Sequence, residues 1–403
     1  MDNRLFCRAY QLCAALLLRI RPVKKGQLIT GEGCLADAAQ LFSSRGIDKV
    51  GVITTAGTVR RGTLAPLLKR FAELDIGYAV FDGVKPDPDI GCIDAAAELL
   101  LREGCRGIIA VGGGSAMDCA KMAAAKAACP GKSVIRMKGL MKIHRKLPFL
   151  AAVPTTAGTG SEITAAAVVT DSGRDYKFTV MDFCIVPEAA VLDPALTAGL
   201  PADITAETGM DAFTHAIEAY TNRFASAKTN GYAMEAIKLI NENLPAAVKA
   251  GGSAMDCADM AARENMLMGS YYAGLAFTNG YVGYVHALAH AIGGMYHIPH
   301  GRACAVMLPE VLESYGDAID VPMARIADAL EIGGADNEAK KTALIAHIRN
   351  MIETAGICCR IEELREEDIP ELASRAAAEA NPAYPVPKIL NRIQLENVIR
   401  KKL

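Results

Sequence analysis

The stretch GIIAVGGGSAMDCAKMAAAKAA, residues 107–128, decides the fold class of this 403-residue chain. It opens with a short apolar run of the kind found in buried strands, passes through three glycines and continues into an alanine-rich run with helical character. Glycines between a strand and a helix let a phosphate approach the first backbone N–H groups of the helix. The spacing is neither G-x-G-x-x-G nor that of a nucleotide-hydrolysing P-loop, so the loop alone does not identify a ligand.

The same alternation continues on both sides of this stretch. Apolar runs of strand type occur in KVGVIT, GYAVFDG and FLAAVPTT, at residues 49–54, 77–83 and 149–156. Helical spacing lies between them, over residues 62–74 and 91–104. Strands that alternate with helices predict a parallel sheet covered by helices on both faces, and hence an α/β domain.

The pattern changes further along the chain. AAAVVTDSGRDYKFTVM, residues 165–181, has two extended parts on either side of Asp171–Arg174 and predicts a hairpin. Beyond residues 196–202 the chain shows long Ala-, Leu-, Ile- and Met-rich helical stretches. We therefore expect an α/β domain over residues 1–199 and an all-helical domain over residues 200–403.

The N-terminal segment RLFCRAYQLCAALLLRIRPVKK, residues 4–25, has an apolar centre between arginines. Its apolar run is too short to span a bilayer, and no small-residue cleavage site of a signal peptide follows it. We interpret residues 1–45 as a helix and a lead-in to the α/β domain.

Composition excludes several classes of function. Lys plus Arg number 43 and Asp plus Glu number 45, a net charge of −2 with no basic block, which argues against a nucleic-acid surface. Twelve cysteines are scattered without any C-x-x-C pair, so we expect free thiols in the reducing cytoplasm. We expect no membrane association.

A second loop, PTTAGTGSE at residues 154–162, also follows a predicted strand. Its three threonine hydroxyls and two glycines are suited to lining a ribose or phosphate site. Open α/β sheets bind ligands at the carboxyl ends of their strands, where both loops lie. The two loops together predict a dinucleotide or another phosphorylated ligand.

Histidines are concentrated in one segment. GYVHALAHAIGGMYHIPHG, residues 283–301, holds four of the seven histidines of the chain. Asp211 and His215 are four residues apart in a helical stretch, so both project from one face, and His286 and His290 repeat this spacing. We expect the second helix to end at Gly293–Gly294. One carboxylate and several imidazoles suit Fe(II), Zn(II), Ni(II) or Co(II) better than Mg or Ca.

A divalent ion beside a dinucleotide predicts a type of reaction. The ion acts as a Lewis acid on a substrate oxygen, and an alcohol so activated can release hydride to a nicotinamide. In the reverse direction a polarised carbonyl accepts the hydride.

With these segments in order, the chain resembles the iron-dependent (group III) alcohol dehydrogenases. The matching segments are VFDGVKPDP, GGGSAMDCAK, PTTAGTGSE, ETGMDAFTHAIEAY and HALAHAIGGMYHIPHG, and they cover about residues 45–310. The resemblance implies a Rossmann-like N-terminal domain, an all-helical C-terminal domain, and a cleft between them for coenzyme and metal.

The resemblance also implies site residues. The metal ligands carry over to Asp211, His215, His286 and His300. His290 corresponds to a non-ligand histidine with a proton-relay or substrate-orienting role, and Phe277 is a candidate for the substrate-pocket wall. The coenzyme-binding residues carry over to Gly113, Gly114, Ser115, Asp118, Thr155, Thr156, Thr159 and Lys177.

One departure concerns coenzyme choice. NAD-preferring members often carry an aspartate after the first strand, where this chain has Thr55 in VITTAG. A carboxylate there would repel the 2′-phosphate of NADP, whereas threonine would not. Both NAD and NADP are therefore compatible with this position.

The expected function is a metal-dependent oxidoreductase that transfers hydride between NAD(P) and a small alcohol, aldehyde or ketone. The expected ion is Fe²⁺, with Zn²⁺ as a second candidate, and the family implies a homodimer or higher homo-oligomer. A dehydroquinate-synthase-like or glycerol-dehydrogenase-like enzyme acting on a polyol or cyclic substrate is the alternative. The segment around the histidines is otherwise apolar, which favours a small uncharged substrate.

Overall fold

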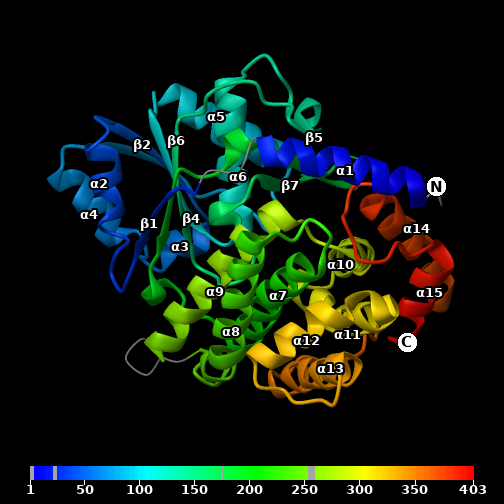
Figure 1. Ribbon diagram of the computed structural model, residues 1–403. Helices are drawn as coiled ribbons and strands as arrows, with labels where there is room; N and C mark the ends of the chain where they lie inside the picture. The colour runs from blue at the N-terminus through cyan, green and yellow to red at the C-terminus, as the bar shows by residue number, and fades with distance from the viewer. Residues whose placement is uncertain (1–3, 21–24, 174–175, 253–258) are drawn as a thin grey trace. The chain divides into compact units, whose positions relative to one another are not determined.

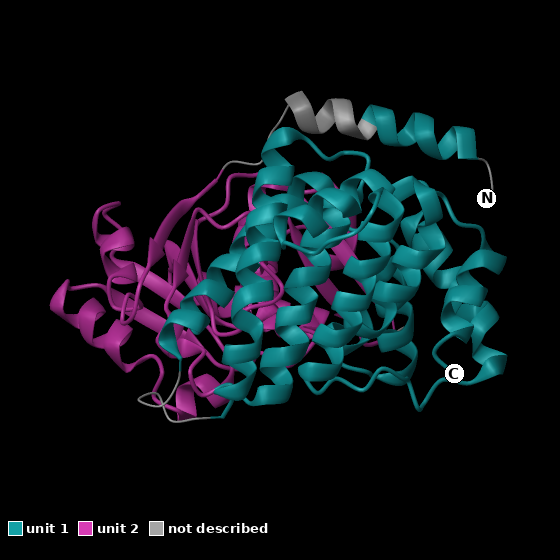
Figure 2. Ribbon diagram, turned by 60° about the horizontal axis from the view of Figure 1, so that its bottom comes forward, with its two compact units in different colours: residues 1–22, 200–253, 257–403 teal, residues 23–199, 254–256 magenta. Residues whose placement is uncertain are grey.

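The structure is a computed structural model that describes residues 4–20, 25–173, 176–252 and 259–403, the side chains of residues 14–20 excepted (Figure 1). The described residues form two compact units, which Figure 2 draws in different colours. We call the part between residues 25 and 199 the sheet unit. We call residues 4–20 together with the described residues from 200 onward the helical unit.

The sheet unit contains a six-stranded sheet in which all neighbouring strands are parallel. The strand order is β1-β9-β6-β4-β2-β3, with β1 Gln27–Thr30, β2 Lys49–Ile53, β3 Gly77–Phe81, β4 Gly107–Gly112, β6 Phe149–Pro154 and β9 Ala189–Leu192. Every residue of the central strands β4 and β6 is buried, because helices cover both faces of the sheet. The predicted parallel sheet is confirmed.

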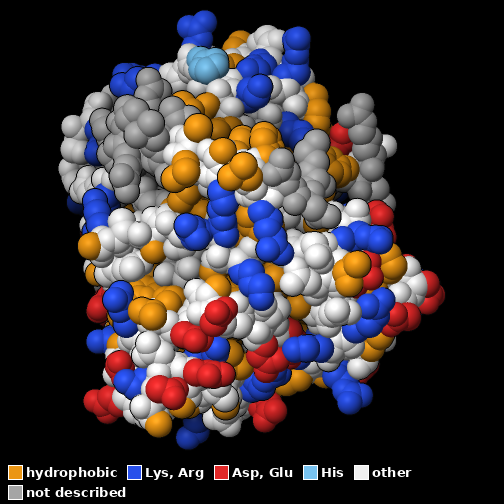
Figure 3. Space-filling model, turned by 45° about the vertical axis from the view of Figure 1, so that its right-hand side comes forward, with side chains coloured by type: hydrophobic (Ala, Val, Ile, Leu, Met, Phe, Trp, Pro, Cys, Tyr) orange, Lys and Arg blue, Asp and Glu red, His pale blue; other side chains and the backbone are white. Residues whose placement is uncertain are grey.

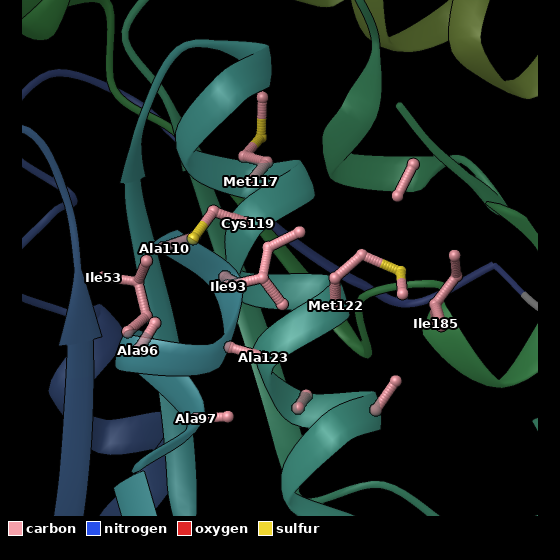
Figure 4. Close-up of a cluster of buried hydrophobic side chains, with 14 of the residues drawn as sticks. Ile53, Ile93, Ala96, Ala97, Ala110, Met117, Cys119, Met122, Ala123 and Ile185 are labelled. Carbon is pink, nitrogen blue, oxygen red and sulfur yellow. The ribbon is translucent and has the colours of Figure 1, made fainter. Parts of the chain in front are cut away.

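Alternate residues of the central strands pack into two clusters of buried apolar side chains. Ile108 and Ala110 of β4 belong to one cluster with α5 (Ile90–Arg102) and α6 (Gly114–Ala128), part of which Figure 4 shows. Ile109 and Val111 belong to the other with α2 (Ala38–Ser43) and α4 (Ala65–Glu73). This period of two is that of a strand with a core on each face.

A small second sheet completes the unit. Strands β7 (Ala166–Asp171) and β8 (Tyr176–Met181) pair antiparallel, and β5 (Gly139–Leu140) pairs with β8. The predicted hairpin is therefore present, although Arg174 in its turn lies outside the described residues. The remaining elements of the unit are α3 Ala56–Arg60, η1 Val134–Met137, η2 Ser161–Ile163, η3 Phe183–Ile185 and η4 Pro194–Leu196.

The helical unit has no strand among its described residues, as predicted. Its helices are α1 Arg4–Ile20, α7 Ala202–Thr221, α8 Ala227–Lys249, α9 Met260–Gly280, α10 Tyr284–Tyr296, α11 His300–Tyr315, η6 Gly316–Ile319, α12 Asp320–Ala329, α13 Asn337–Thr354, η7 Glu366–Asp368, α14 Ile369–Ala380 and α15 Arg392–Arg400. Helix α7 is buried without interruption from Gly209 to Thr221, because α8, α9 and α11 all pack on it. It is the central helix of this unit.

Helix α1 differs from the sequence-based division, which assigned residues 1–45 to the α/β domain. Arg8 donates hydrogen bonds to the carbonyl oxygens of Val386 and Pro387, at 2.8 and 3.0 Å, and Gln11 donates to that of Tyr384 at 2.7 Å. These polar contacts hold α1 against the C-terminal part of the helical unit. None of the described helices is long and apolar enough to cross a bilayer.

Helix α10 also differs from expectation, because it continues through Gly293 and Gly294 to Tyr296. It ends where His297 adopts the left-handed conformation at φ 57°, with its N–H bonded to the carbonyl oxygen of Gly293. Two glycines weaken a helix but do not stop it when neighbouring turns are packed. On the surface, acidic and basic side chains are interspersed over the lower part of the face in Figure 3, which fits the near-zero net charge.

Candidate active site

The two glycine- and threonine-rich loops lie side by side at the carboxyl edge of the parallel sheet. Gly112 at the end of β4 is in register with Pro154 at the end of β6, and the N–H of Thr155 donates to the carbonyl oxygen of Gly112 at 3.0 Å. A Cβ on Gly114 would lie 2.9 Å from a methyl carbon of Thr159. The glycine at position 114 is thus needed for the close packing of the two loops, which brings the predicted loop residues together.

The loop before α5 is linked to the same edge. The hydroxyl oxygen of Ser115 accepts the N–H of Asp87 at 3.3 Å, and the Asp87 carboxylate lies 2.7 Å from Nζ of Lys177 on β8. Ser115 and Lys177 are therefore neighbours through Asp87. Thr55 follows β2 and is the N-cap of α3, where its side chain accepts the N–H of Thr58 at 3.3 Å.

Asp118 lies deeper than the loop residues and already has protein partners. Its carboxylate accepts the hydroxyl of Ser161 at 2.7 Å and the N–H of Val168 at 2.9 Å, and burial raises its pKa. Lys121, which the sequence analysis missed, donates to Ser161 at 2.7 Å and to Thr164 at 3.0 Å. Its side chain is completely buried, and burial lowers its pKa to about 8. These two residues hold the second loop against α6.

The predicted metal ligands come together in the helical unit. Helix α7 carries Asp211 and His215, α10 carries His286, and α11 begins at His300. Oδ1 of Asp211 lies 3.8 Å from Nδ1 of His215, 3.6 Å from Nε2 of His286 and 3.5 Å from Nε2 of His300. Donors about 2.1 Å from a tetrahedral ion stand about 3.4 Å apart, so the separations are close to those of a ligand set.

Three donor atoms of this group are buried without a hydrogen-bond partner. Oδ1 of Asp211, Nδ1 of His215 and Nε2 of His286 are buried without a hydrogen bond. Buried polar atoms are normally satisfied, and an unsatisfied cluster of them is accounted for by a bound cation. Burial raises the pKa of Asp211, but the surrounding imidazoles outweigh burial and hold it well below its ordinary value, so this carboxylate is ionised. The residues present therefore fit a divalent ion.

A glycine lets α11 approach α7 closely enough for this geometry. A Cβ on Gly301 would lie only 2.2 Å from the backbone oxygen of Glu207, one turn before Asp211. A side chain at position 301 would therefore displace the start of α11. Because His300 is the adjacent residue, its distance to Asp211 depends on this contact.

Glu218 supports the site and was not predicted from the sequence. Its Oε2 lies 2.6 Å from Nδ1 of His286, and its two oxygens accept the N–H groups of Gly283 and Val285, both at 2.8 Å. Since an ionised carboxylate only accepts, Nδ1 of His286 carries a proton, which leaves Nε2, on the side of Asp211, as the ring atom that can bind an ion. Glu218 therefore fixes the orientation of the His286 ring.

His290 lies next to the cluster. Its ring is nearly parallel to that of His300, with centroids 5.0 Å apart. Its Nδ1 lies 2.7 Å from Oε1 of Glu379 on α14, which also accepts the hydroxyl of Tyr384 at 2.7 Å. Phe277 stacks on His215, with ring centroids 4.2 Å apart. His297 is exposed and ends α10.

A buried thiol completes the surroundings of the histidines and was also missed. Sγ of Cys304, on α11, lies 3.6 Å from Nε2 of His300. Its sulfur and one donor atom each of Asp211, His286 and His300 lie within 4.8 Å of one another. Burial raises the pKa of Cys304 to about 12.

Comparison with known proteins identifies the family. Residues 26–194 match the family model described as "Iron-containing alcohol dehydrogenase". Residues 205–403 match the model described as "Fe-containing alcohol dehydrogenase family, C-terminal". The chain is 36% identical over 379 residues to 1,3-propanediol dehydrogenase of Klebsiella pneumoniae, covering 93% of this chain and 94% of that protein. It is 35% identical over 352 residues to NAD-dependent methanol dehydrogenase of Bacillus methanolicus, with 86% and 91% covered.

A solved structure agrees with the sequence comparison. The crystal structure of a 1,3-propanediol oxidoreductase matches with a TM-score of 0.88 at 34% identity, covering 94% of this chain and 98% of that one. The fold, the converging donors and these similarities lead to one conclusion: the chain belongs to the iron-containing alcohol dehydrogenase family.

Proposed function

We propose that this protein is an NAD(P)-dependent alcohol dehydrogenase or aldehyde reductase that uses one divalent ion held by Asp211, His215, His286 and His300. The observation that carries the proposal is the cluster of buried donor atoms around Asp211 that have no protein partner. The dehydrogenase relatives support it, whereas no relative described above favours the dehydroquinate-synthase-like or glycerol-dehydrogenase-like alternative.

The ion, when bound, supplies a Lewis acid that makes an alcohol hydroxyl more acidic, and the nicotinamide accepts the hydride. The protein contributes position and charge. Asp211 supplies the negative charge that offsets part of the charge of the ion, and Glu218 holds His286 in the tautomer that can ligate. Burial lowers the pKa of His215, which keeps this imidazole in the neutral form that binds metals.

The coenzyme would be bound by the paired loops of the sheet unit. Gly113 and Gly114 at the start of α6 leave room for a pyrophosphate near the first N–H groups of that helix. The proposed threonine contacts are Thr155, Thr156 and Thr159. Asp118 is proposed to act through Ser161, whose hydroxyl donates a hydrogen bond to the Asp118 carboxylate at 2.7 Å. Lys177 is proposed to contact the coenzyme near Ser115. A relative is named as NAD-dependent, and Thr55 leaves NADP compatible.

His290 is proposed to orient the substrate and to relay its proton. Glu379 accepts from Nδ1 of His290, so Nε2 keeps a lone pair that can take a proton. Phe277 would form part of the pocket wall through its contact with His215. The substrate is proposed to be a small uncharged alcohol, aldehyde or ketone, in keeping with the propanediol and methanol named for relatives. We also propose a cytoplasmic homodimer or higher oligomer without nucleic-acid partners.

The test uses metal-depleted protein reloaded with Fe(II) or Zn(II) and assayed with a panel of alcohols and aldehydes, using NAD(H) and NADP(H). We expect net coenzyme reduction with a small alcohol, dependent on metal. His286→Ala and His300→Ala should lose both bound metal and activity while their circular dichroism stays that of the native fold. Full turnover by metal-free protein would overturn the assignment.

A further inference from the structure

The metal site contains a sulfur atom that the ligand set above does not use. Cys304 follows His300 by four residues, so both side chains project from the same face of α11. The thiol is completely buried and its Sγ lies 3.6 Å from Nε2 of His300. It thus faces the donor cluster rather than the apolar core alone.

The distances match those of a ligand. With a Zn–S bond of about 2.3 Å and a Zn–N bond of about 2.1 Å, neighbouring sulfur and nitrogen donors of a four- or five-coordinate ion stand about 3.1–3.8 Å apart. The observed separation between Cys304 and His300 lies in this range. Cys304, Asp211, His286 and His300 each place one donor atom within 4.8 Å of the others, which makes them a compact group of donors that could hold one ion.

We propose that Cys304 is a sulfur ligand of the catalytic ion, in addition to the carboxylate and imidazole donors. This inference rests on the proposed function for the presence of the ion. On binding, the thiol releases its proton to solvent and its sulfur lone pair forms the bond to the metal, with no change of oxidation state. In the absence of the ion, Sγ of Cys304 and Nε2 of His300 share a weak hydrogen bond at 3.6 Å.

A sulfur ligand changes which ion the site prefers. Thiolate is a softer donor than imidazole or carboxylate, and it favours Zn(II) over the harder first-row ions. The thiolate also adds a second negative charge to that of Asp211. We therefore expect this chain to discriminate more strongly for Zn(II) against Fe(II) than the same site without sulfur.

X-ray absorption at the zinc edge tests the proposal on the full-length protein. Zinc-loaded wild type should show one sulfur neighbour at about 2.3 Å in addition to nitrogen and oxygen neighbours at 2.0–2.2 Å. Cys304→Ser and Cys304→Ala should lack the sulfur neighbour. Cys7→Ser, which replaces a buried thiol of α1 in the same unit, should retain it. Competition titrations should show the Zn(II)/Fe(II) affinity ratio at least tenfold lower in Cys304→Ala than in wild type.

The outcomes separate this inference from the proposed function. Stoichiometric zinc with only nitrogen and oxygen neighbours in wild type would overturn the sulfur ligand and leave the dehydrogenase proposal standing. Absence of bound metal in wild type would overturn both. If the Cys304 variants fail to fold, the wild-type spectrum alone still decides, and a sulfur-to-metal charge-transfer band in the Co(II)-loaded wild type provides a second measurement.

Discussion

Glu218 Oε2 lies 2.6 Å from His286 Nδ1, and the same carboxylate accepts the N–H groups at the start of α10. One buried side chain of α7 thus places both His286 and the helix that carries it. When a histidine binds a metal, removing the group that accepts its other ring N–H typically lowers metal affinity about 10–100-fold.

Glu218→Gln should therefore weaken metal binding about 10–100-fold, because the amide has one acceptor oxygen for three donors and no charge to stabilise the His286 N–H. Competition with a chelator of known affinity measures this. Glu371→Gln, in an exposed pair with Arg375, is the matched control and should leave the affinity unchanged. Wild-type affinity in Glu218→Gln would show that His286 is oriented by other contacts.

Gly301→Ala tests the approach of α11 to α7. The new Cβ would lie 2.2 Å from the backbone oxygen of Glu207. Because that oxygen belongs to the backbone, the clash can be relieved only if α7 or α11 moves. We expect a loss of metal affinity and a lower unfolding temperature, both measured on the purified variant. Gly294→Ala places a Cβ where no atom lies within 4 Å and should be neutral or slightly stabilising. Equal behaviour of the two variants would contradict the packing argument.

The sequence carried enough signal for the sheet and for the clustering of Asp211 with the histidines. Strand-type runs followed by glycines predicted β4 and β6, and four-residue spacing predicted that Asp211 and His215 share a face. Glu218 lies seven residues after Asp211 on that same face, so helical periodicity could have found it. Cys304 likewise lies one turn from His300.

Other features had no local signal. Glu379 reaches His290 from a helix that begins 79 residues later, at Ile369, and no spacing rule predicts that contact. The four-residue strands β1 and β9 are too short to show alternation. The end of α10 depends on tertiary packing that overrides two glycines, and the place of α1 depends on hydrogen bonds to residues near the C-terminus.

Glu379→Gln tests the orientation of His290. Its carboxylate accepts from both His290 and Tyr384, so a neutral amide in this place no longer fixes the proton on Nδ1. We expect kcat to fall about 10–100-fold, less than the roughly 10²–10⁴-fold cost of losing an acid–base group outright, because His290 itself stays in place. KM for the coenzyme and bound metal should stay as in wild type. Tyr384→Phe keeps the Glu379 carboxylate, so its kcat should fall much less. A fall in metal content equal to that in kcat would indicate a purely structural role.

Cys92 should be an unusually reactive thiol near neutral pH. Its Sγ lies 3.9 Å from that of Cys119, and the hydrogen bond from Cys119 lowers the pKa of Cys92 to about 7. Figure 4 shows Cys119 among the buried apolar side chains that pack between β4, α5 and α6. Since the thiolate is the nucleophile, alkylation of Cys92 by iodoacetamide should rise with pH through a midpoint near 7.

Peptide mass spectrometry of pulse-labelled protein measures this midpoint. Cys119→Ala removes the donor and should move the midpoint upward, toward that of an ordinary thiol. Cys105 is the internal control, because burial raises its pKa and its labelling should begin only at higher pH. A wild-type midpoint for Cys92 as high as that of Cys105 would contradict the role of Cys119.

Thr55→Asp tests the position of the coenzyme ribose. Thr55 is the N-cap of α3, and aspartate and asparagine are both good N-caps, so either replacement keeps the helix start intact. The carboxylate would repel a 2′-phosphate within a few ångströms, whereas NAD carries no charge there. We expect KM for NADP to rise at least about tenfold in Thr55→Asp, a difference of about 1.4 kcal/mol, with KM for NAD within about twofold of wild type. Thr55→Asn, which caps without charge, should leave both values unchanged in steady-state assays. An equal loss with both coenzymes in Thr55→Asp would remove Thr55 from the 2′ site.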